Sequence, residues 1–584
     1  MLAGARCKAS DSHVHYPDTA PMAKLMNRYV AGAFVWLLVV ALPQPVVAKQ
    51  MVAVANPLAA EAGMAVLRSG GTAADAAVAV QAVLGLVEPQ SSGIGGGAFL
   101  LYWDASARNL ITIDGRETAP ASATPGRFLD DEGEKHGFWK SMVGGQSVGV
   151  PGTVRSFDLL HQLFGNRPWA ELFEFAIQLA EDGFAVSPRL STSIARAKHL
   201  DRFDTTRDYF FQDGKARDAG TILRNPDYAK TLRAIASGGA DAFYQGAIAQ
   251  QIVDAVNATS WRKNNITMAD LAGYKAKVRP PVCAPYRGYE ICGMGPPTSG
   301  GLTVGQILGM LSHFDLPSMS WGPEVAHLFA EAQKLAFADR GLYMADADFV
   351  QMPTRGLLDA EYLKARAALI STEKAGAKAD AGKPPGAENF AYAATAQRDL
   401  VGTSHFVIRD ADGNALSVTT TIESGFGSRV MTGGFLLNNE LTDFARQPLK
   451  DGKLVANRVE GGKRPRSSMS PTIVMRRGAP HLLVGSPGGS RIIGYVAKTL
   501  IGILDFGMTP QQAIDLGHVI HRNGKTLDLE SDTDAAVMSD ALEAKGHTVK
   551  VRPMTSGIHA ILLGPNGLTG GADPRREGVV RASH

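Results

Sequence analysis

Gly402-Thr403-Ser404-His405-Phe406-Val407-Ile408 places a threonine at the start of a segment rich in apolar residues. A short polar turn follows at residues 410–414 (Asp-Ala-Asp-Gly-Asn), and residues 415–422 are rich in Val and Thr. Two such segments joined by a short turn that contains Gly predict a β-hairpin. The threonine therefore stands at the head of the hairpin's first strand.

The segment before this hairpin, residues 374–397, consists largely of Ala, Gly, Lys, Asp, Glu and Pro. It has almost no large apolar side chain, so it buries too little surface to offset the entropy of ordering it. We expect an exposed, mobile strap. Cleavage of the peptide bond before Thr403 would make this threonine a new N-terminus. The alternative is that a threonine stands here only because Thr favours β-strands.

Composition sets limits on the class of protein. The chain has 584 residues, of which 45% are hydrophobic, and a formal charge of +3. This length allows two to four domains and a large core. The nearly balanced charge gives no excess that would indicate a nucleic-acid partner.

The N-terminal region has the pattern of a secretory signal. A basic residue precedes the apolar run 31–42, which is short for a membrane span, and small residues lead up to Ala48. Cleavage after Ala48 predicts a periplasmic or secreted protein; the alternative is an uncleaved anchor. Residues 1–25 are polar and would be an upstream extension, with the true start at Met22 or Met26.

Three cysteines in so long a chain exclude a disulfide framework. Cys283 and Cys292 flank Tyr286-Arg-Gly-Tyr289, which predicts a hairpin. Outside the cytoplasm this pair would form one cross-strand disulfide, or it would remain two buried thiols. The sequence leaves both possibilities open.

Helical and strand-like segments together predict an α+β protein in which helices cover antiparallel sheets. The Ala-rich residues 57–86 predict two helices, because Gly70-Gly71 interrupts them and Thr72 begins a capping pattern. Further helices are expected within 152–274 and at 302–311, 324–339 (amphipathic), 491–504 and 510–518. Strands are expected at 98–103, 110–113, 403–409, 415–422, 434–438, 472–476 and 481–485.

Three motifs resemble functional sites but stand in the wrong context. Residues 93–98 fit the dinucleotide pattern GxGxxA, yet they follow a helix and open a strand, the reverse of what that site needs. Ser147 in the GQSVG motif matches the elbow of serine hydrolases, but no apolar strand precedes it. Residues 410–414 begin like a calcium loop but lack its later Gly and Glu, so a hairpin turn explains them better.

Four segments rich in Gly, Ser, Arg and Asn contain better candidates for site residues than these three motifs. They are RETAP at 116–120, LLNNELTD at 436–443, RPRSSMSP at 464–471 and GSPGGSR at 485–491. The last leads into a helix, so its backbone N–H groups can face an anion and form an oxyanion hole. Each segment alone predicts no more than a tight turn.

In this order the segments resemble the γ-glutamyltranspeptidase family, also called glutathione hydrolase. The resemblance runs from about Val52 to Pro574. Its motifs are SGIGGGAF at 92–99, RETAP at 116–120, SVGVPGTV at 147–154, YRGYEI at 286–291, PPTSGG at 296–301, ADRGLYMADADFV at 338–350, TSHF at 403–406, FGS at 426–428, LLNNELTDF at 436–444, RPRSSMSPTIV at 464–474, GSPGGSRI at 485–492 and ADPR at 572–575. Colinear matches over such a span are specific, and they identify SGIGGG and SVGVPG as scaffold turns.

The resemblance implies an N-terminal nucleophile hydrolase with a four-layer αββα sandwich, made as a proenzyme. Residues 1–48 would be an extension and signal, and cleavage before Thr403 would separate a large subunit, 49–402, from a small subunit, 403–584. The two would remain one interwoven domain, a heterodimer from a single precursor.

By motif match, Thr403 forms the γ-glutamyl ester and Thr421 hydrogen-bonds it, while Gly488 and Gly489 supply the oxyanion hole. A threonine hydroxyl is a weak nucleophile, and a freed α-amine with a pKa of about 7.7 to 8.0 is a nearby base of suitable strength. His405 is then not needed as a base and is expected to be structural. Neither a cofactor nor a metal is expected.

The resemblance also assigns the donor site. Arg116, with Ser467 and Ser468, would hold the donor's α-carboxylate, because a guanidinium offers a two-pronged fork to a carboxylate. Asp443 would hold the α-ammonium. Glutathione or another γ-glutamyl compound would be the donor, and water or an amino-acid or peptide acceptor would resolve the ester.

The chain departs from the family where Asn and Gln often contact the donor's α-amino end, since it carries Glu423 and Glu440. These carboxylates would either strengthen the grip on an ammonium or mark a changed specificity, as in relatives that are glutaryl cephalosporin acylases. A glutaryl donor would leave three carboxylates facing nothing positive, which argues against it. An uncleaved, inactive exported binding protein is a further alternative.

A second departure lies between Phe444 and Ser467. This stretch is shorter than in family members with a tyrosine-bearing lid, and it contains no Tyr. We therefore expect a more open pocket that tolerates bulkier substrates.

Overall fold

The computed structural model describes residues 48–263, 265–395 and 402–583. The expected signal region, apart from Ala48, and the last residues before Gly402 lie outside these ranges. Within them, none of the helices is both long and apolar enough to cross a membrane. The protein is α+β, as the sequence predicts.

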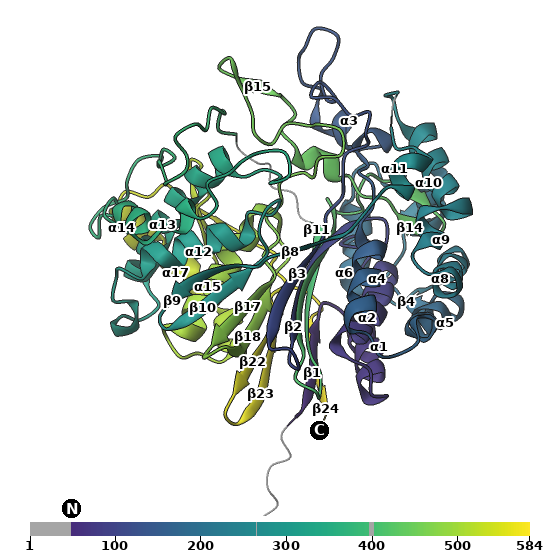
Figure 1. The fold of residues 1–584 in the computed structure, drawn as a ribbon, viewed down its shortest axis with the longest axis horizontal. Helices are drawn as coiled ribbons and strands as arrows, with labels where there is room; N and C mark the ends of the chain where they lie inside the picture. The colour runs from purple at the N-terminus through teal and green to yellow at the C-terminus, as the bar shows by residue number, and fades with distance from the viewer. Residues whose placement is uncertain (1–47, 264, 396–401, 584) are drawn as a thin grey trace, which may run out of the picture. The chain divides into compact units, whose positions relative to one another are not determined.

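A seven-stranded antiparallel sheet contains the predicted hairpin at its centre (Figure 1). Its strands, in spatial order, are β24 (Val579–Ser583), β1 (Gln50–Val54), β11 (Gly402–Arg409), β12 (Ala415–Glu423), β2 (Gly97–Asp104), β3 (Asn109–Gly115) and β8 (Lys277–Arg279). In the turn between β11 and β12, the carboxylate of Asp410 accepts hydrogen bonds from Asn414 and from the N–H of Ala73. The turn therefore joins the hairpin to a helix, which explains these acidic residues without calcium.

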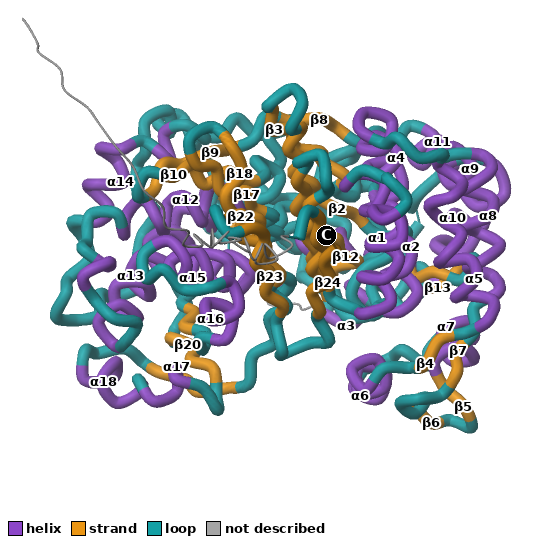
Figure 2. Tube along the Cα trace, turned by 90° about the horizontal axis from the view of Figure 1, so that it is seen from below, coloured by secondary structure: helices purple, strands orange, loops and turns teal. Residues whose placement is uncertain are grey.

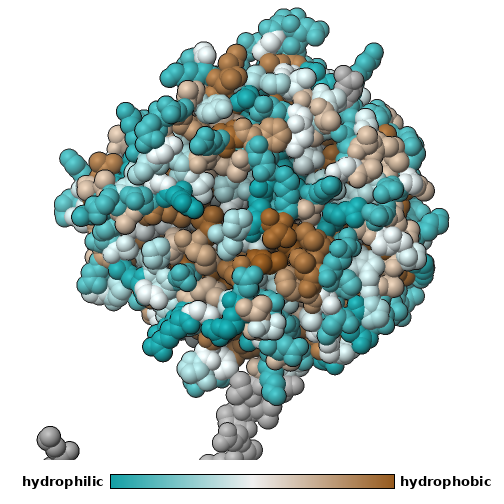
Figure 3. All heavy atoms as spheres, viewed as in Figure 1, coloured by the Kyte–Doolittle hydropathy of each residue, from teal (hydrophilic) through white to brown (hydrophobic). Residues whose placement is uncertain are grey.

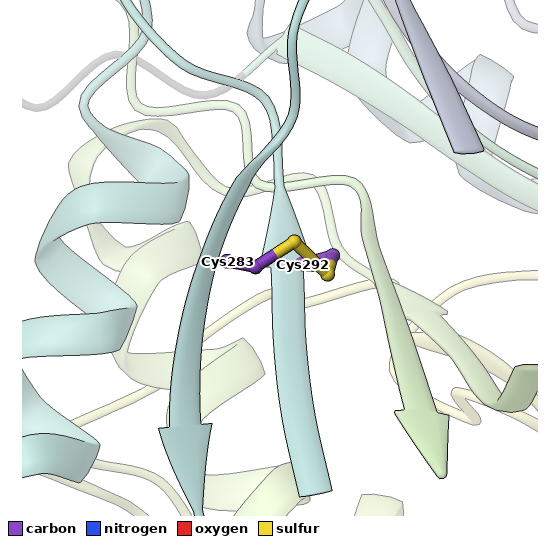
Figure 4. Close-up of a disulfide and its surroundings, with 2 residues drawn as sticks. All are labelled: Cys283 and Cys292. Atoms are coloured by element: carbon purple, nitrogen blue, oxygen red, sulfur yellow. A yellow bond between two sulfur atoms is a disulfide. The ribbon is translucent and has the colours of Figure 1, made fainter. Parts of the chain in front are cut away.

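A six-stranded antiparallel sheet packs against the first. Its strands, in spatial order, are β23 (Gly567–Ala572), β22 (His559–Gly564), β18 (Ala479–Gly485), β17 (Thr472–Arg476), β10 (Tyr289–Gly293) and β9 (Val282–Tyr286). β11 and β12 contact β22 and β18 across the interface between the sheets. Cys283 and Cys292 face each other on β9 and β10 and form a disulfide, with their Cα atoms 4.0 Å apart (Figure 4). The structure thus selects the oxidised alternative.

Helices cover the outer faces of both sheets (Figures 1 and 2). α1 (Pro57–Arg68), α2 (Ala73–Val87) and α4 (Thr153–Phe164) contact strands of the seven-stranded sheet. α12 (Gly300–Leu311) and α15 (Ile492–Leu504) contact the six-stranded sheet, and α13 (Pro323–Tyr343) packs on α12. On the face drawn in Figure 3, hydrophilic residues dominate the outline and apolar residues gather near the middle.

The seven-stranded sheet is buried on both faces. Phe406 and Ile408 point into the core shared with α1 and α2, whereas Val407 points into the core shared with the second sheet. Side chains alternate along a strand, so a strand between two cores has every side chain buried. Each position must therefore carry an apolar side chain or a polar one that is hydrogen-bonded inside the protein. This fixes the register of β11 and with it the place of Thr403.

The other elements surround these layers. The remaining helices are α3 (Phe138–Met142), α5 (Glu174–Asp182), α6 (Pro188–Arg196), α7 (Asp204–Phe210), α8 (Pro226–Gly238), α9 (Asp241–Tyr244), α10 (Gly246–Thr259), α11 (Met268–Ala272), α14 (Ala360–Ala367), α16 (Pro510–Asp515), α17 (Asp534–Val537) and α18 (Ser539–Ala544). Short strands are β4 (Phe184–Ala185), β5 (Phe211–Gln212), β6 (Lys215–Ala216), β7 (Ile222–Leu223), β13 (Met431–Thr432), β14 (Phe435–Leu436), β15 (Leu449–Lys450), β16 (Lys453–Leu454), β19 (Val519–Ile520), β20 (Leu527–Glu530) and β21 (Val549–Arg552).

Two expectations were wrong. α13 is buried along nearly its whole length rather than amphipathic, because its polar residues, such as Gln333 and Asp339, find hydrogen-bond partners inside the protein. The described part of the strap, 374–395, lacks helix and strand but is anchored rather than loose. Its backbone bonds to Glu331, Asn523 and Asp339 hold it on the surface.

Candidate active site

Thr403 and Thr421 lie opposite each other on β11 and β12. Their Oγ1 atoms are 3.3 Å apart. Thr421 Oγ1 donates to the carbonyl oxygen of Gly402 at 2.7 Å, and it accepts from the N–H of Glu423 at 2.8 Å. A hydroxyl donor therefore contacts the carbonyl of the peptide bond that precedes Thr403, and the Thr403 hydroxyl lies beside it.

The backbone around Thr403 is held from two further sides. The register of β11 shifts between Gly402 and Thr403, an irregularity that re-aims side chains at a strand end. Arg576 Nη1 donates to the Thr403 carbonyl at 2.8 Å, and Ser404 Oγ donates to Glu88 at 2.9 Å. Thr403 is only 4% exposed, so its position is set by buried contacts.

Gly488 and Gly489 begin the segment that leads into α15. Both have positive φ, 139° and 60°, and a Cβ on Gly488 would lie 2.6 Å from the ring of Tyr495. Glycine is therefore required at Gly488 for space as well as for conformation. Gly489 and Ile492, the first residue of α15, line the same small cavity as Thr403, where the positive end of a helix favours negative charge.

Arg116 is fully buried and shared between two carboxylates. Its Nη1 pairs with Glu440, and its Nη2 pairs with Asp443 at 2.7 Å. Further N–H groups donate to the carbonyl oxygens of Pro465 and Arg466. The residue expected to bind a substrate carboxylate is thus already bonded to protein carboxylates when no substrate is bound.

Ser467 and Ser468 also line the small cavity around Thr403. Arg340 donates to Ser468 Oγ and to Ser299 Oγ, each at 2.7 Å. Ser467 Oγ accepts from the N–H of Met469 at 3.1 Å. These bonds orient both predicted serines, and Arg340 does so from α13, far away in the sequence.

Three buried carboxyl groups near Arg116 have raised pKa values. Burial raises the pKa of Glu423 and of Glu440 well above the usual value, and the repulsion of Asp443 adds to both. Burial also raises the pKa of Glu117 to about 7, although Arg116 opposes the shift. Burial thus disfavours the charged form of these three carboxyl groups, and a nearby cation favours it.

Replacing Glu117 should therefore change how stability depends on pH. A carboxyl whose pKa is higher in the folded state stabilises the fold fully below its unfolded pKa of about 4.5, and this contribution is lost as the pH rises through about 7. We expect the melting temperature to fall between pH 5 and pH 8, and Glu117→Gln to reduce this fall by about 1–3 °C. Glu543→Gln, at an exposed position, is the matched control; equal slopes in the two variants would contradict the prediction.

A cavity of 30 Å³ brings together nine of the ten predicted site residues: Arg116, Thr403, Thr421, Glu423, Glu440, Asp443, Ser467, Ser468 and Gly489. Gly488 is adjacent in the chain to Gly489. Met469 and Ile492 also line the cavity and were not predicted, because an apolar residue after a motif carries no chemical signal. Glu117, Arg340 and Arg576 were missed as well, since their roles depend on contacts between distant segments.

A family model for γ-glutamyltranspeptidase matches residues 59–583. The chain belongs to this family. It is 37% identical over 543 residues to the glutathione hydrolase proenzyme of Bacillus subtilis strain 168, covering 91% of each chain. It is 38% identical over 550 residues to the glutathione hydrolase proenzyme of Escherichia coli K12, again covering 91% of each chain.

A solved structure, the cephalosporin acylase from Bacillus halodurans, is similar with a TM-score of 0.80 and 28% identity. The match covers 94% of this chain and 100% of that one. This chain and the acylase therefore share the same overall fold.

The residues that suggested other chemistry have structural surroundings. Ser147 Oγ donates to the carbonyl oxygens of Met142 and Gly144, so it closes a turn. The GxGxxA segment follows α2 and opens β2, as expected for a scaffold turn. His405 is buried beside His559, bonds to Thr419, and has a pKa held well below its usual value by burial.

One group of side chains in the described residues could hold a metal ion. His327, Glu331 and His547 place one ligand atom each within 4.8 Å of one another. His327 Nδ1 lies 2.8 Å from His547 Nε2, however, and Lys334 lies 2.7 Å from Glu331. Each of the three side chains thus has a protein partner, and none of the three lines the cavity around Thr403.

Proposed function

We propose that this protein is a γ-glutamyltransferase and glutathione hydrolase that cleaves itself before Thr403. The observation that carries the proposal is the contact between Thr421 Oγ1 and the Gly402 carbonyl, next to the Thr403 hydroxyl. A polarised carbonyl with a hydroxyl beside it is the arrangement that attack on the 402–403 bond requires. The names of the relatives support the same activity.

Maturation then follows from this geometry. Thr403 Oγ1 attacks the Gly402 carbonyl carbon, the C–N bond breaks, and the nitrogen takes a proton to become the α-amine of Thr403. Water hydrolyses the resulting ester and leaves a Gly402 carboxylate. The products are the large subunit, 49–402, and the small subunit, 403–584, which stay together because β11 lies between β1 and β12 of the same sheet.

Turnover reuses the same threonine. The freed α-amine accepts the proton of Oγ1 as the hydroxyl attacks the donor's γ-carbonyl, and it returns a proton to the leaving amine. The N–H groups of Gly488 and Gly489, at the positive end of α15, stabilise the oxyanion. Water or an acceptor amine then attacks the ester and regenerates Thr403.

The donor's α-carbon bears an ammonium and a carboxylate, and the cluster around Arg116 is suited to exchange with both. The donor carboxylate would replace a protein carboxylate on the guanidinium of Arg116, with Ser467 and Ser468 as further donors. Asp443, Glu423 and Glu440 would then take the ammonium. Each internal ion pair is thereby replaced, so no buried charge is left alone.

The same proposal covers the layer architecture of the fold and the compartment to which the protein is sent. We assign the two helix-covered sheets to the four-layer αββα sandwich of N-terminal nucleophile hydrolases. We assign residues 1–48 to an extension and signal, which sends the protein to the periplasm or outside the cell. The Cys283–Cys292 disulfide supports an oxidising compartment.

The alternative activity is that of a glutaryl or cephalosporin acylase, which the similarity to the acylase structure keeps open. A glutaryl donor lacks the ammonium, so the carboxylates of Glu423, Glu440 and Asp443 would lose their partner. We expect kcat/KM for γ-glutamyl-p-nitroanilide to exceed that for glutaryl-p-nitroanilide by about 100-fold, the effect of one charged hydrogen-bond set. Faster turnover of the glutaryl compound would establish the acylase instead, and a purified protein that stays a single uncleaved band without activity would indicate a binding protein.

A further inference from the structure

The two histidines and the glutamate that could hold a metal ion come from distant parts of the chain. His327 and Glu331 are four residues apart on α13, so they lie on the same face of that helix. His547 lies between α18 and β21, and α13 contacts α18 (Figure 2). We call these three residues the His327–Glu331–His547 cluster.

The cluster has the ligand types and the spacing of a transition-metal site. Imidazole nitrogens and a carboxylate oxygen are ordinary ligands of Zn²⁺. The three residues are buried, with exposures of 0%, 4% and 6% in chain order. Nδ1 of His327 lies 2.8 Å from Nε2 of His547, which lies 3.9 Å from Oε1 of Glu331. Tetrahedral zinc ligands are about 3.4 Å apart, so shifts of roughly half an ångström would accommodate the ion.

Backbone groups orient two of the three side chains. The carbonyl oxygen of Ser371 accepts a hydrogen bond from His327 Nε2 at 2.7 Å, so in a neutral ring the lone pair lies on Nδ1, the atom that faces His547. The N–H of Gly376 donates to Oε2 of Glu331 at 3.1 Å. Oε1 of Glu331 is buried and has no hydrogen-bond partner in the described part of the chain. Outer contacts of this kind fix the tautomer and orientation of metal ligands.

Two existing contacts would be replaced when the ion binds. The hydrogen bond between the two histidines places a proton on Nε2 of His547, and a neutral imidazole can carry this proton on Nδ1 instead. Lys334 lies 2.7 Å from Oε1 of Glu331, but its ammonium also donates to the carbonyl oxygens of Gly376 and Ala377. Lys334 therefore keeps partners when Glu331 turns to the ion, although its charge weakens the binding of a cation.

A cavity of 430 Å³ gives the cluster an open side. His547 lines this cavity, together with Lys334 and His521. An ion can enter from this side, and a water molecule from the cavity can complete a set of four ligands.

We propose that His327, Glu331 and His547 bind a divalent transition-metal ion of the Zn²⁺ class, with water as the fourth ligand. Two of the ligands precede the 402–403 peptide bond and His547 follows it, so after cleavage the ion would join the large and small subunits. Only this bridging role rests on the proposed cleavage. The ion takes no part in the chemistry at Thr403, because none of its ligands lines the cavity there.

Zinc titration of the full chain tests the site. The protein is purified without a polyhistidine tag and treated with EDTA, which is then removed. We expect one Zn²⁺ per chain with a Kd of about 1 μM or lower. At about 100 times Kd, zinc should raise the melting temperature by about 2–3 °C.

Variants of the ligands locate the bound ion. Glu331→Gln and His547→Gln each remove a ligand with little change in volume. Each should raise Kd at least about 100-fold, since even the outer contacts of metal ligands are worth about 10- to 100-fold. His313→Gln, at an exposed histidine, is the matched control and should leave Kd unchanged.

A gain of affinity distinguishes ligand loss from misfolding. Lys334→Met removes the competing ammonium and should lower Kd about tenfold, which a damaged fold would not do. X-ray absorption at the zinc edge of the loaded wild type should show two imidazoles and oxygen ligands. If the ligand variants fail to fold, these two measurements still decide the proposal.

Three results would overturn the site. They are no zinc binding below about 100 μM, equal Kd values for the wild type and both ligand variants, and an unchanged Kd in Lys334→Met. An absorption spectrum with fewer than two imidazoles would do the same. Thr403→Ala should bind zinc as tightly as the wild type, because the ligands are in place before cleavage. If the wild type is not cleaved or does not release p-nitroaniline, the proposed function fails, whereas zinc binding is decided by these titrations alone.

Discussion

Thr403→Ala is expected to abolish both maturation and turnover. The variant should run as one chain, near 61.8 kDa if nothing is removed from its N-terminus, whereas the wild type should give two bands. Without Oγ1 no attack on the Gly402 carbonyl is possible, and no ester can form with a donor. We expect kcat to fall by at least about 10⁴-fold, as when other enzymes lose their nucleophile.

The cut site is checked directly by N-terminal sequencing of the smaller wild-type band. It should begin Thr-Ser-His-Phe, the residues from 403 onward. A different first residue would move the nucleophile elsewhere, and an active Thr403→Ala variant would remove the mechanism altogether.

Ser147→Ala is the control for this prediction, because Ser147 is the other residue in a motif typical of nucleophiles. Its hydroxyl is committed to two carbonyl oxygens in a buried turn. The variant should still form two bands and retain turnover, at a cost in stability of about 1 kcal/mol for the lost hydrogen bonds. The opposite pattern, with Thr403→Ala active and Ser147→Ala inactive, would indicate a serine hydrolase.

The hairpin that carries Thr403 could be predicted from sequence because local signals determine it. Two Val- and Thr-rich segments and a polar turn are contiguous, and β11 and β12 form with nearly the expected bounds. The burial of α13 was not predictable in this way. Its polar residues are satisfied by segments that are distant in the sequence, so its composition resembles that of a half-exposed helix.

The candidate site could likewise be predicted only in part, where local signals determine it. Motif order identified the residues that line the small cavity, because each motif keeps its functional side chain within a few positions. The ion pairs among them were not predictable, since Arg116 and Asp443 are 327 residues apart. The motif predicts that Arg116 binds a substrate carboxylate, whereas in the structure protein carboxylates are bonded to it.

This pairing has a consequence for specificity. The Arg116 guanidinium pairs with the buried carboxylates of Glu440 and Asp443 when no donor is bound. If this cluster is the donor site, as we propose, a donor would need both a carboxylate and an ammonium, because either group alone would leave a buried charge without a partner. A glutaryl donor has no ammonium, so it would leave a buried protein carboxylate without a cation. This free-energy cost would make the site discriminate against glutaryl donors.

Arg116→Lys is expected to raise KM for γ-glutamyl donors by about 30- to 100-fold. A lysine keeps the positive charge, but its point-like ammonium cannot bond to two carboxylates and to the Pro465 and Arg466 carbonyls at once. The loss corresponds to about 2–3 kcal/mol, the size of a hydrogen bond to a charged group. The change should leave the two-band pattern intact, because Arg116 makes no contact with Gly402 or Thr403 among its hydrogen bonds.

Steady-state kinetics with γ-glutamyl-p-nitroanilide measure this effect, and glutaryl-p-nitroanilide tests its origin. KM for the glutaryl compound should also rise. This compound has the same carbon chain with a terminal carboxylate as the γ-glutamyl compound, and the lysine offers that carboxylate no new contact. Arg207→Lys, at an exposed arginine that pairs with Asp204, is the matched control and should leave both KM values unchanged. An unchanged KM in Arg116→Lys would remove Arg116 from the donor site, and Glu440 and Asp443 would then be its structural partners rather than ligands for an ammonium.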